Sequence, residues 1–205
     1  MGLRTARPRT TMPLDGVWDF AWLGDADLSP SAVEAGTPLE GAVFRRRAAV
    51  PGCFDTLPEL AGARGTAAWR TTFRQADEPS GELRFDGVGI WAAVYLDGSL
   101  AHVHRKPYSP FAVEVPGSPN ATRELVVVVD NRFDVDRSPL QENYFDFYAY
   151  GGIFRPVAYT PLPAVHITDV RVTTASLDPA AVDVVVRATT EEGVELAYLV
   201  DGKEV

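Results

Sequence analysis

The sequence predicts an all-β protein built as a β-sandwich. The chain has 205 residues with 17 glycines and 16 prolines, so turns are frequent and the runs between them are short. Strand-like runs dominate these intervals. The helical signals, in Ser31–Ala35 and Leu57–Ala61, are each about one turn long and fall short of an average helix.

The predicted strands follow one another from the first aromatic run to the region around residue 160. Each run is bounded by Gly, Pro, Asp or Asn, the residues that favour turns. The predicted strands are Val17–Trp22, Val43–Val50, Trp69–Phe73, Glu82–Phe85, Ala92–Asp97, Leu100–His104, Phe111–Val115, Leu125–Val129 and Ile153–Tyr159.

Four of these strands carry further information about their place in a sheet. The arginine run 45–47 predicts that Val43–Val50 is an exposed edge strand, because charge blunts edges. Asp97-Gly98 predicts a two-residue hairpin turn, since a type I′ turn needs positive φ at both positions. Leu125–Val129 is continuously apolar, as expected of a strand buried on both faces. Pro156 predicts an edge position or a bulge in Ile153–Tyr159.

A domain boundary is predicted at residues 161–163, where two prolines flank a leucine. Beyond it, strands are expected at Val165–Thr173, Val182–Arg187 and Glu195–Val200. An immunoglobulin-like sandwich needs about seven strands in about 100 residues. We therefore expect an unfinished second domain here; the alternative is that these strands complete the first sandwich.

Charge and cysteine content exclude several functional classes. The net charge is −9 and the pI is about 4.8, which disfavours a nucleic-acid partner. A single cysteine, Cys53, rules out a disulfide within the chain and fits a reducing, cytoplasmic location. A buried structural thiol is favoured over a nucleophile, because no helix N-terminus or histidine is evident beside it. No apolar run approaches a membrane span.

The usual cofactor and metal motifs are missing, so no cofactor and no metal are expected. His102 and His104 share one face of a predicted strand, but no third ligand is evident and a polar hairpin face is favoured. The acidic loop 130–136 carries four oxygen-bearing side chains that could hold Ca²⁺ or Na⁺. A solvated loop between strands is the favoured interpretation.

Residues 143–157 form the most informative stretch. Aromatic residues surround Asp146 ahead of a predicted turn at Gly151-Gly152. Aromatic faces bind the C–H faces of sugars, and a carboxylate accepts hydrogen bonds from hydroxyls. From the residues alone, packing of these aromatics in a core is at least as good an interpretation.

The motif Tyr144-Phe145-Asp146-Phe147, followed by residues 150–157, resembles the end of the sugar-binding domain in glycoside hydrolase family 2. The resemblance is closest to β-glucuronidases and then to β-galactosidases, and covers about residues 12–174. The other matching segments, in order, are Leu14–Phe20, Val50–Asp55, Trp69–Phe73, Leu83–Val88, Val94–Gly98 and Tyr108–Phe111. Ala149 stands where β-glucuronidases usually carry Asn, which leaves the sugar open.

The resemblance implies three regions: a flexible N-terminus at 1–11, a jelly-roll (galactose-binding-domain-like) β-sandwich at 12–163, and the first strands of an immunoglobulin-like domain at 164–205. It implies the non-catalytic N-terminal region of a retaining exo-β-glycosidase, in which Asp146 contacts the terminal β-linked sugar. Tyr144 and Tyr148, from the same aromatic stretch, are expected as further substrate-binding residues. No catalytic residue is expected, because the family's catalytic barrel alone needs about 250 residues. The isolated chain should therefore be inactive.

The implied partners are the sugar, the catalytic barrel of the same protein, and further copies in a homo-oligomer; neither nucleic acid nor a membrane is expected. Two other functions stay open. The chain could be a free-standing carbohydrate-binding module, or a structural β-sandwich that binds no ligand.

Overall fold

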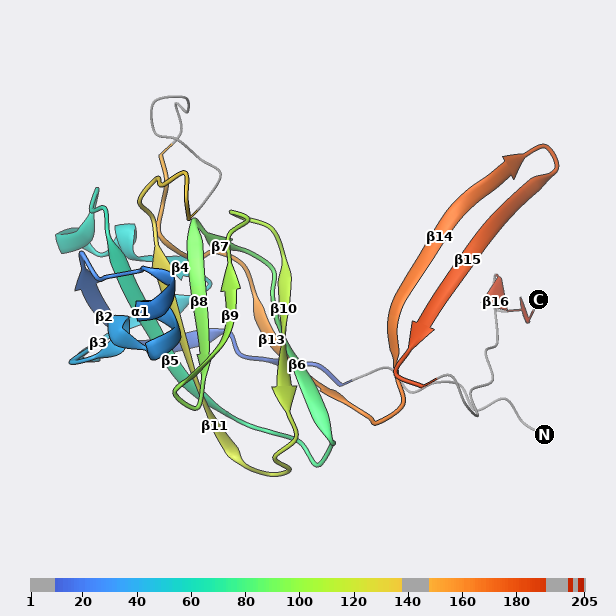
Figure 1. Ribbon diagram of the computed structural model, residues 1–205, viewed down its shortest axis with the longest axis horizontal. Coiled ribbons are helices and arrows are strands. Elements are labelled where there is room, and N and C mark those ends of the chain that lie inside the picture. The colour runs from blue at the N-terminus through green and yellow to red at the C-terminus, as the bar shows by residue number, and fades with distance from the viewer. Residues whose placement is uncertain (1–9, 138–147, 191–198, 201–202, 205) are drawn as a thin grey trace. The chain divides into compact units, whose positions relative to one another are not determined.

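The computed structural model describes residues 10–137, 148–190, 199–200 and 203–204. It divides into two units, Met1–Pro161 and Leu162–Val205 (Figure 1). Within the described residues, helical structure is limited to α1 (Pro30–Ala35) and the short 3₁₀ turns Thr37–Leu39, Phe54–Thr56 and Pro58–Leu60. All other regular elements among these residues are strands. The strand pairs with a described register are antiparallel. The prediction of an all-β protein is confirmed.

The larger sheet of the first unit has six strands in the order β3-β2-β5-β11-β8-β9. The edge strand β3 carries the arginine run, as predicted, and Arg46 forms an ion pair with Glu59. The strand bounds are β2 Gly16–Gly24, β3 Arg46–Val50, β5 Thr66–Arg74, β8 Trp91–Leu96, β9 Ser99–His104 and β11 Thr122–Asp130.

Two smaller sheets complete the first unit. A four-stranded sheet has the order β1-β13-β6-β10, and a three-stranded sheet has the order β4-β12-β7. The strand bounds are β1 Met12–Pro13, β4 Gly52–Cys53, β6 Ser80–Phe85, β7 Val88–Gly89, β10 Phe111–Pro116, β12 Gly152–Ile153 and β13 Val157–Leu162.

One hydrophobic core joins the six-stranded and four-stranded sheets. Trp69 of β5 and Val127 of β11 share a single buried cluster with Leu83 of β6 and Tyr159 of β13. Each of these four side chains is fully buried. Side chains from two sheets that interleave in one core define a sandwich, and Figure 1 shows the sheets stacked in this way.

Strand β11 contributes to a second core on the other face of the same sheet. Val126 and Val128 pack there with Val33 of α1 and with Tyr95, whose hydroxyl donates to the Val33 carbonyl at 2.7 Å. Leu125–Val129 is buried throughout, because alternate residues enter the two cores. The prediction of a strand buried on both faces is confirmed.

The predicted hairpin is also confirmed. Asp97 and Gly98 connect β8 to β9 with φ values of 50° and 81°, the positive angles that the turn requires. The Asp97 side chain then accepts a hydrogen bond from the Glu124 amide at 2.8 Å, which ties the turn to β11.

The region around Pro156 differs from the prediction of a single strand over Ile153–Tyr159. The chain forms β12, leaves the sheet, and starts β13 at Val157 in a different sheet. Between them, the Phe154 amide donates to the Gly87 carbonyl at 3.0 Å. Pro156 has no N–H to donate, so the break falls where a ladder bond could not form.

The second unit contains the long antiparallel ribbon β14 (Ile167–Leu177) and β15 (Ala180–Ala188), together with the two-residue pair β16 (Leu199–Val200) and β17 (Lys203–Glu204). Apolar side chains of the ribbon are exposed, among them Val172 at 61% and Val182 at 60%. A two-stranded ribbon cannot bury its own faces.

A stack of aromatic rings closes one side of the sandwich. His104 of edge strand β9 stacks on Phe111 of edge strand β10, with ring centroids 4.1 Å apart, and Phe111 stacks on Phe85 at 4.8 Å. His104 is buried, and its Nε2 donates to the Lys106 carbonyl at 2.6 Å. His102 also stacks on Phe111, so the expectation of a polar hairpin face is wrong.

Burial of the stack predicts a loss of stability in acid. Burial lowers the pKa of His104 below its ordinary value of 6.5, and also lowers that of His102. As the pH falls, these histidines therefore become protonated at a higher pH in the unfolded chain than in the folded chain. Stability should be full above about pH 6.5 and should fall as the pH drops below it.

His104→Gln keeps a donor for the Lys106 carbonyl but cannot titrate. Urea unfolding between about pH 7.5 and 5.5 should therefore show a shallower pH dependence in this variant than in the parent chain. Identical slopes would contradict the assignment.

Candidate functional site

Two exposed tyrosines mark the candidate site. Of the three residues predicted to contact a sugar, Tyr144 and Asp146 lie outside the described residues, while Tyr148 is described and 38% exposed. Tyr150 is 51% exposed, and the centroids of the two tyrosine rings are 4.6 Å apart at an interplanar angle of 50°. The pair offers an accessible aromatic surface.

The backbone beside these tyrosines is held by side chains from three distant segments. The buried Ala149 carbonyl accepts hydrogen bonds from Nη1 of Arg64 at 2.6 Å and from Nδ2 of Asn131 at 3.0 Å. The Gly151 amide donates to Oδ2 of Asp55 at 2.9 Å. Backbone groups on both sides of Tyr150 are therefore fixed by side chains, and the Gly151 carbonyl also accepts a hydrogen bond from the Phe54 amide at 2.9 Å.

The glycines that follow serve close packing, not a tight turn. A Cβ on Gly151 would lie 2.1 Å from the Phe54 ring, and one on Gly152 would lie 2.3 Å from the Gly52 carbonyl oxygen. Gly152 already belongs to β12, and neither glycine has a positive φ. The prediction of a Gly-Gly turn is wrong; glycine is required because β12 passes directly against the 52–54 segment.

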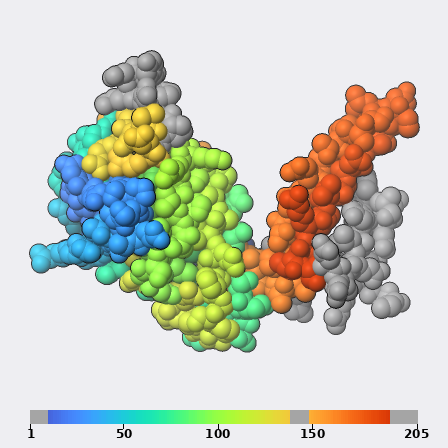
Figure 2. All heavy atoms as spheres, in the orientation of Figure 1, coloured from blue at the N-terminus to red at the C-terminus, as the bar shows by residue number. Residues whose placement is uncertain are grey.

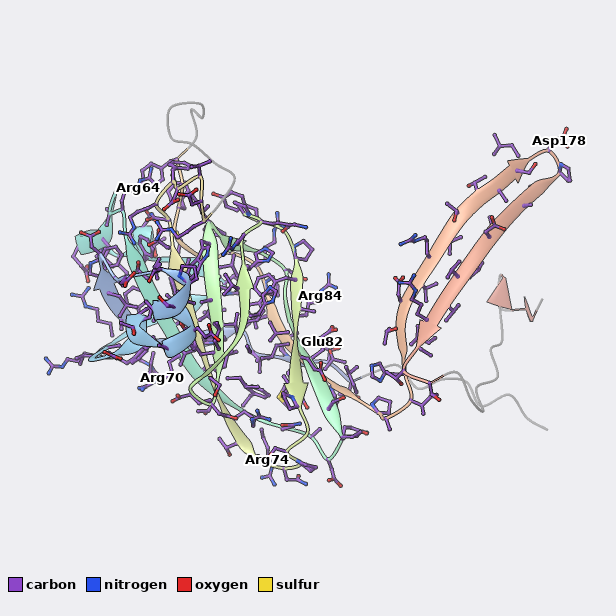
Figure 3. All side chains as sticks on the ribbon, in the orientation of Figure 1. Arg64, Arg70, Arg74, Glu82, Arg84 and Asp178 are labelled. Atoms are coloured by element: carbon purple, nitrogen blue, oxygen red, sulfur yellow. The ribbon has the colours of Figure 1, made fainter. Side chains whose placement is uncertain are left out.

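The Arg64 guanidinium lies over two aromatic rings, and Figure 3 shows where Arg64 stands in the first unit. Its Cζ is 4.5 Å from the centroid of Tyr148 and 5.5 Å from that of Phe133. No carboxylate of the described residues forms an ion pair with it, whereas Arg123 and Arg132 each pair with aspartate. Among the described residues, its contacts therefore include two aromatic faces and a backbone carbonyl.

The polar groups around Tyr148 shift its proton affinity. Burial raises the pKa of Tyr148, and the nearby Asp55 carboxylate raises it further. Oδ1 of Asp55 is buried and has no hydrogen-bond partner in the described part of the chain. The cluster therefore combines neutral phenols, a guanidinium and a carboxylate.

The first half of the acidic loop is a buried structural element, so the expectation of a solvated loop is wrong there. Asp130 is 1% exposed and accepts hydrogen bonds from the Thr66 hydroxyl at 2.6 Å and from Nη2 of Arg132 at 2.6 Å. Its oxygens are already used by these donors. No group of His, Cys, Asp and Glu that could hold a metal ion occurs among residues whose placement is described.

Arg132 extends this network to the segment that leads into α1. Its Nη1 lies 3.0 Å from Oδ1 of Asp25. Figure 2 shows the loop after β11 lying against that segment on the surface of the first unit.

Asn131 is fully buried and uses its whole amide. Its Oδ1 accepts from the Gly65 amide at 2.9 Å, and its Nδ2 donates to the carbonyls of Ala63 and Ala149 at 3.0 Å each. One side chain thereby joins the loop that carries Arg64 to the backbone after Tyr148.

Cys53 is a partly buried thiol. Burial raises its pKa, and the Asp55 carboxylate raises it further, so the thiol form is favoured. This environment opposes nucleophilic chemistry, in agreement with the structural interpretation.

Sequence reasoning missed Arg64, Asn131 and Asp55 as partners of the Tyr148 segment. Arg64 is 85 positions away from Ala149, and Asp55 is 96 positions away from Gly151. No local pattern reports contacts at such separations. Asp55 stood within a matched segment, which was the one available signal.

Comparison with known proteins places this arrangement in context. No family model matches the chain. The chain is 32% identical over 94 residues to a putative β-glucuronidase of Formosa agariphila, covering 45% of this chain and 11% of that protein. It is 33% identical over 95 residues to a β-galactosidase of Thermoanaerobacterium thermosulfurigenes, covering 45% of this chain and 13% of that protein.

Solved structures extend the similarity over most of the chain. A GH2 β-galacturonidase from Eisenbergiella tayi shares 27% identity with a TM-score of 0.66, covering 84% of this chain and 28% of that one. A β-glucuronidase from an uncultured Clostridium species shares 25% identity with a TM-score of 0.72, covering 94% and 36%.

These matches confirm the resemblance: the chain is related to the N-terminal region of glycoside hydrolase family 2 enzymes. It spans 28% and 36% of the length of these two solved structures, and 11% and 13% of the two curated relatives. In the described part of the chain, no helix has the length and apolar character needed to cross a membrane.

The Asp130 network predicts a large effect of removing one charge. Asp130→Asn leaves the Arg132 guanidinium without its buried partner, and should destabilise the chain by about 3–5 kcal/mol. The matched control is Asp136→Asn, an exposed position in the same loop, which should change stability by less than about 0.5 kcal/mol. Urea unfolding measures both; equal values for the two variants would contradict the structural role of Asp130.

Proposed function

We propose that this chain forms the non-catalytic, sugar-facing N-terminal region of a retaining exo-β-glycosidase of the β-glucuronidase or β-galactosidase type. The observation that carries the proposal is the exposed Tyr148–Tyr150 pair, which lies directly after the segment whose motif resembles the sugar-binding end of the family's N-terminal domain. In this proposal the first unit is a jelly-roll domain, and the ribbon of the second unit begins an immunoglobulin-like domain.

The chemistry of the cluster supports a carbohydrate ligand. Tyrosine rings present flat apolar faces to sugar C–H groups, while phenol and carboxylate oxygens bind hydroxyls. Tyr148 and Tyr150 supply the rings, and Tyr144 and Asp146 are proposed as further contacts on the grounds of the motif. Asp146 accepts hydrogen bonds from hydroxyls of the terminal β-linked sugar.

Bond cleavage itself is assigned to another part of the protein. A retaining mechanism needs two carboxyl groups about 5–5.5 Å apart, one as acid/base and one as nucleophile. We propose that these groups stand on a barrel domain of the same protein, that this chain forms one wall of the pocket, and that a cytoplasmic homo-oligomer is the working form. No cofactor enters the proposal.

A free-standing carbohydrate-binding module is the second candidate, because an exposed tyrosine pair can bind sugars without a catalytic domain. The two candidates differ in the affinity expected of the isolated chain. A single wall loses most of the converging contacts of a pocket, so a glycosidase region should bind monosaccharides weakly.

The isolated chain should hydrolyse neither aryl β-glucuronides nor aryl β-galactosides, and should bind the free sugars with a dissociation constant above about 100 µM, or about −5.5 kcal/mol. Release of chromophore above a mock preparation measures activity, and calorimetry measures binding. Turnover by the chain would contradict the proposal. Tight sugar binding without turnover would favour the free-standing module.

The Asp146→Asn variant tests the proposed sugar contact. In the longer, barrel-containing protein that the proposal requires, kcat/KM should fall about 100-fold or more, the scale expected when a charged hydrogen bond to substrate is lost. Asp183→Asn, an exposed position on β15, is the matched control and should leave kcat/KM unchanged. The melting temperature of the 205-residue chain should change little with either substitution. Unfolding caused by Asp146→Asn would instead assign that residue a structural role.

A further inference from the structure

The Arg64 guanidinium contacts two consecutive residues of the candidate site in two different ways. Its Nη1 donates to the Ala149 carbonyl at 2.6 Å, while its Cζ lies 4.5 Å from the centroid of the Tyr148 ring. A planar guanidinium can use its edge for hydrogen bonds and its face for stacking at the same time. One side chain therefore restrains both the ring of Tyr148 and the peptide that follows it.

Some arginines of this chain form ion pairs with aspartates, and Arg64 is used differently. The chain is acid-rich, with 28 Asp and Glu residues against 19 Lys and Arg. Arg70, Arg123 and Arg132 each form an ion pair with an aspartate. Arg64 forms none with any described carboxylate; among the described residues it contacts the Ala149 carbonyl, the Tyr148 ring, and the Phe133 ring at 5.5 Å.

Two other side chains of the cluster, Asn131 and Asp55, hold the backbone of the tyrosine segment. Asn131 also donates to the Ala149 carbonyl, and Asp55 holds the Gly151 amide, so the backbone stays anchored without the arginine. Asp55 also interacts with the Tyr148 hydroxyl, whereas Arg64 lies over the face of the ring. Tyr150 lies beside the ring, with the two centroids 4.6 Å apart, and is itself 51% exposed. Arg64 also contacts the ring, and the backbone on either side of Arg64 is hydrogen-bonded to Asn131.

The backbone at Arg64 is anchored, because both neighbouring residues, Ala63 and Gly65, are hydrogen-bonded to Asn131. The Ala63 carbonyl accepts from Nδ2 of Asn131 at 3.0 Å, and the Gly65 amide donates to Oδ1 of Asn131 at 2.9 Å. Thr66 then begins β5, in the centre of the sandwich. The guanidinium thus connects the exposed Tyr148 ring to a segment that is anchored where β5 begins.

We propose that Arg64 is a positioning residue, which acts on the sugar through Tyr148 and not by touching the sugar itself. The inference rests on the proposed function, because it takes Tyr148 to be a sugar contact. A ring held in one orientation binds without first losing rotamer freedom, and small misplacements of a contact weaken catalysis strongly. Loss of Arg64 should leave the fold in place and loosen Tyr148.

The first experiment uses the 205-residue chain and reports the ring directly. Arg64→Met removes the charge and the hydrogen bond while keeping an unbranched apolar side chain. The ring resonances of Tyr148, assigned with selectively labelled tyrosine, should shift and average in this variant. The melting temperature should fall by only about 2–4 °C. Unchanged Tyr148 resonances would overturn the proposal.

Arg155→Met is the matched control for the loss of an arginine that bonds to carbonyls. Nη1 of Arg155 donates to the Tyr108 carbonyl at 2.9 Å and to the Asp86 carbonyl at 3.3 Å, and the residue is exposed. The same substitution there should leave the Tyr148 resonances as in the parent chain. A shift of equal size in both variants would show a general loosening and would count against Arg64.

The second experiment measures kinetics in the barrel-containing protein. Arg64→Met should raise KM about tenfold with a smaller change in kcat, since binding loses a preorganised contact. Arg64→Lys, which keeps a cation over the ring but not the planar fork, should recover part of this loss. Arg155→Met should leave KM unchanged.

A double-mutant cycle with Tyr148→Ala separates positioning from direct contact. If Arg64 acts through the ring, then Arg64→Met should have no further effect on KM once the ring is gone. Additive effects of the two substitutions would overturn the proposal, because Arg64 would then act independently of Tyr148. A third outcome is that Tyr148→Ala alone leaves KM unchanged, although the Tyr148 resonances shift in the Arg64→Met variant. Arg64 would then position the ring, but the ring would not contact the sugar. The proposed role of Tyr148 then fails, and the inference fails with it.

Discussion

The burial of β11 on both faces is the constraint on which the rest of the first unit depends. A strand whose every side chain from Leu125 to Val129 is buried must lie in the middle of a sheet with a core on each side. This fixes β5 and β8 as its neighbours and places α1 over the outer face. It also means that the chain leaves β11 while still inside the protein, so the residues at its end must satisfy their polar groups internally.

Asp130 and Asn131 meet that requirement, and in doing so they build the frame of the candidate site. The carboxylate takes its donors from Thr66 and Arg132, and the amide takes both its acceptor and donor partners from the 63–65 segment and Ala149. Asn131 thus satisfies the polar end of a buried strand and also holds the backbone of the tyrosine segment. Stability and site geometry share these residues, because low dielectric surroundings make such satisfied networks strong and incomplete ones costly.

Local patterns in the sequence were enough to predict the sheets but not their junctions. The Asp-Gly hairpin, the arginine-rich edge strand and the apolar β11 were all found correctly, since each depends on residues a few positions apart. The switch between sheets at Pro156 and the packing role of Gly151 depend on segments that lie elsewhere in the sequence, and both were predicted wrongly. The assignments of Tyr144 and Asp146 stay predictions, since those residues lie outside the described part of the chain.

The tyrosine pair shows why a site of this kind leaves so faint a trace in a single sequence. Tyr148 and Tyr150 read equally well as core residues, and only their exposure in the folded chain distinguishes the two interpretations. Their exposure follows from the residue between them: Ala149 is fully buried, and its carbonyl is held from below by Asn131. The Tyr150 amide donates to the Tyr148 carbonyl at 3.2 Å, so the chain makes a three-residue turn at Ala149, with the small alanine buried and both neighbouring rings exposed. The surface that the site presents thus depends on the small buried alanine between the two tyrosines.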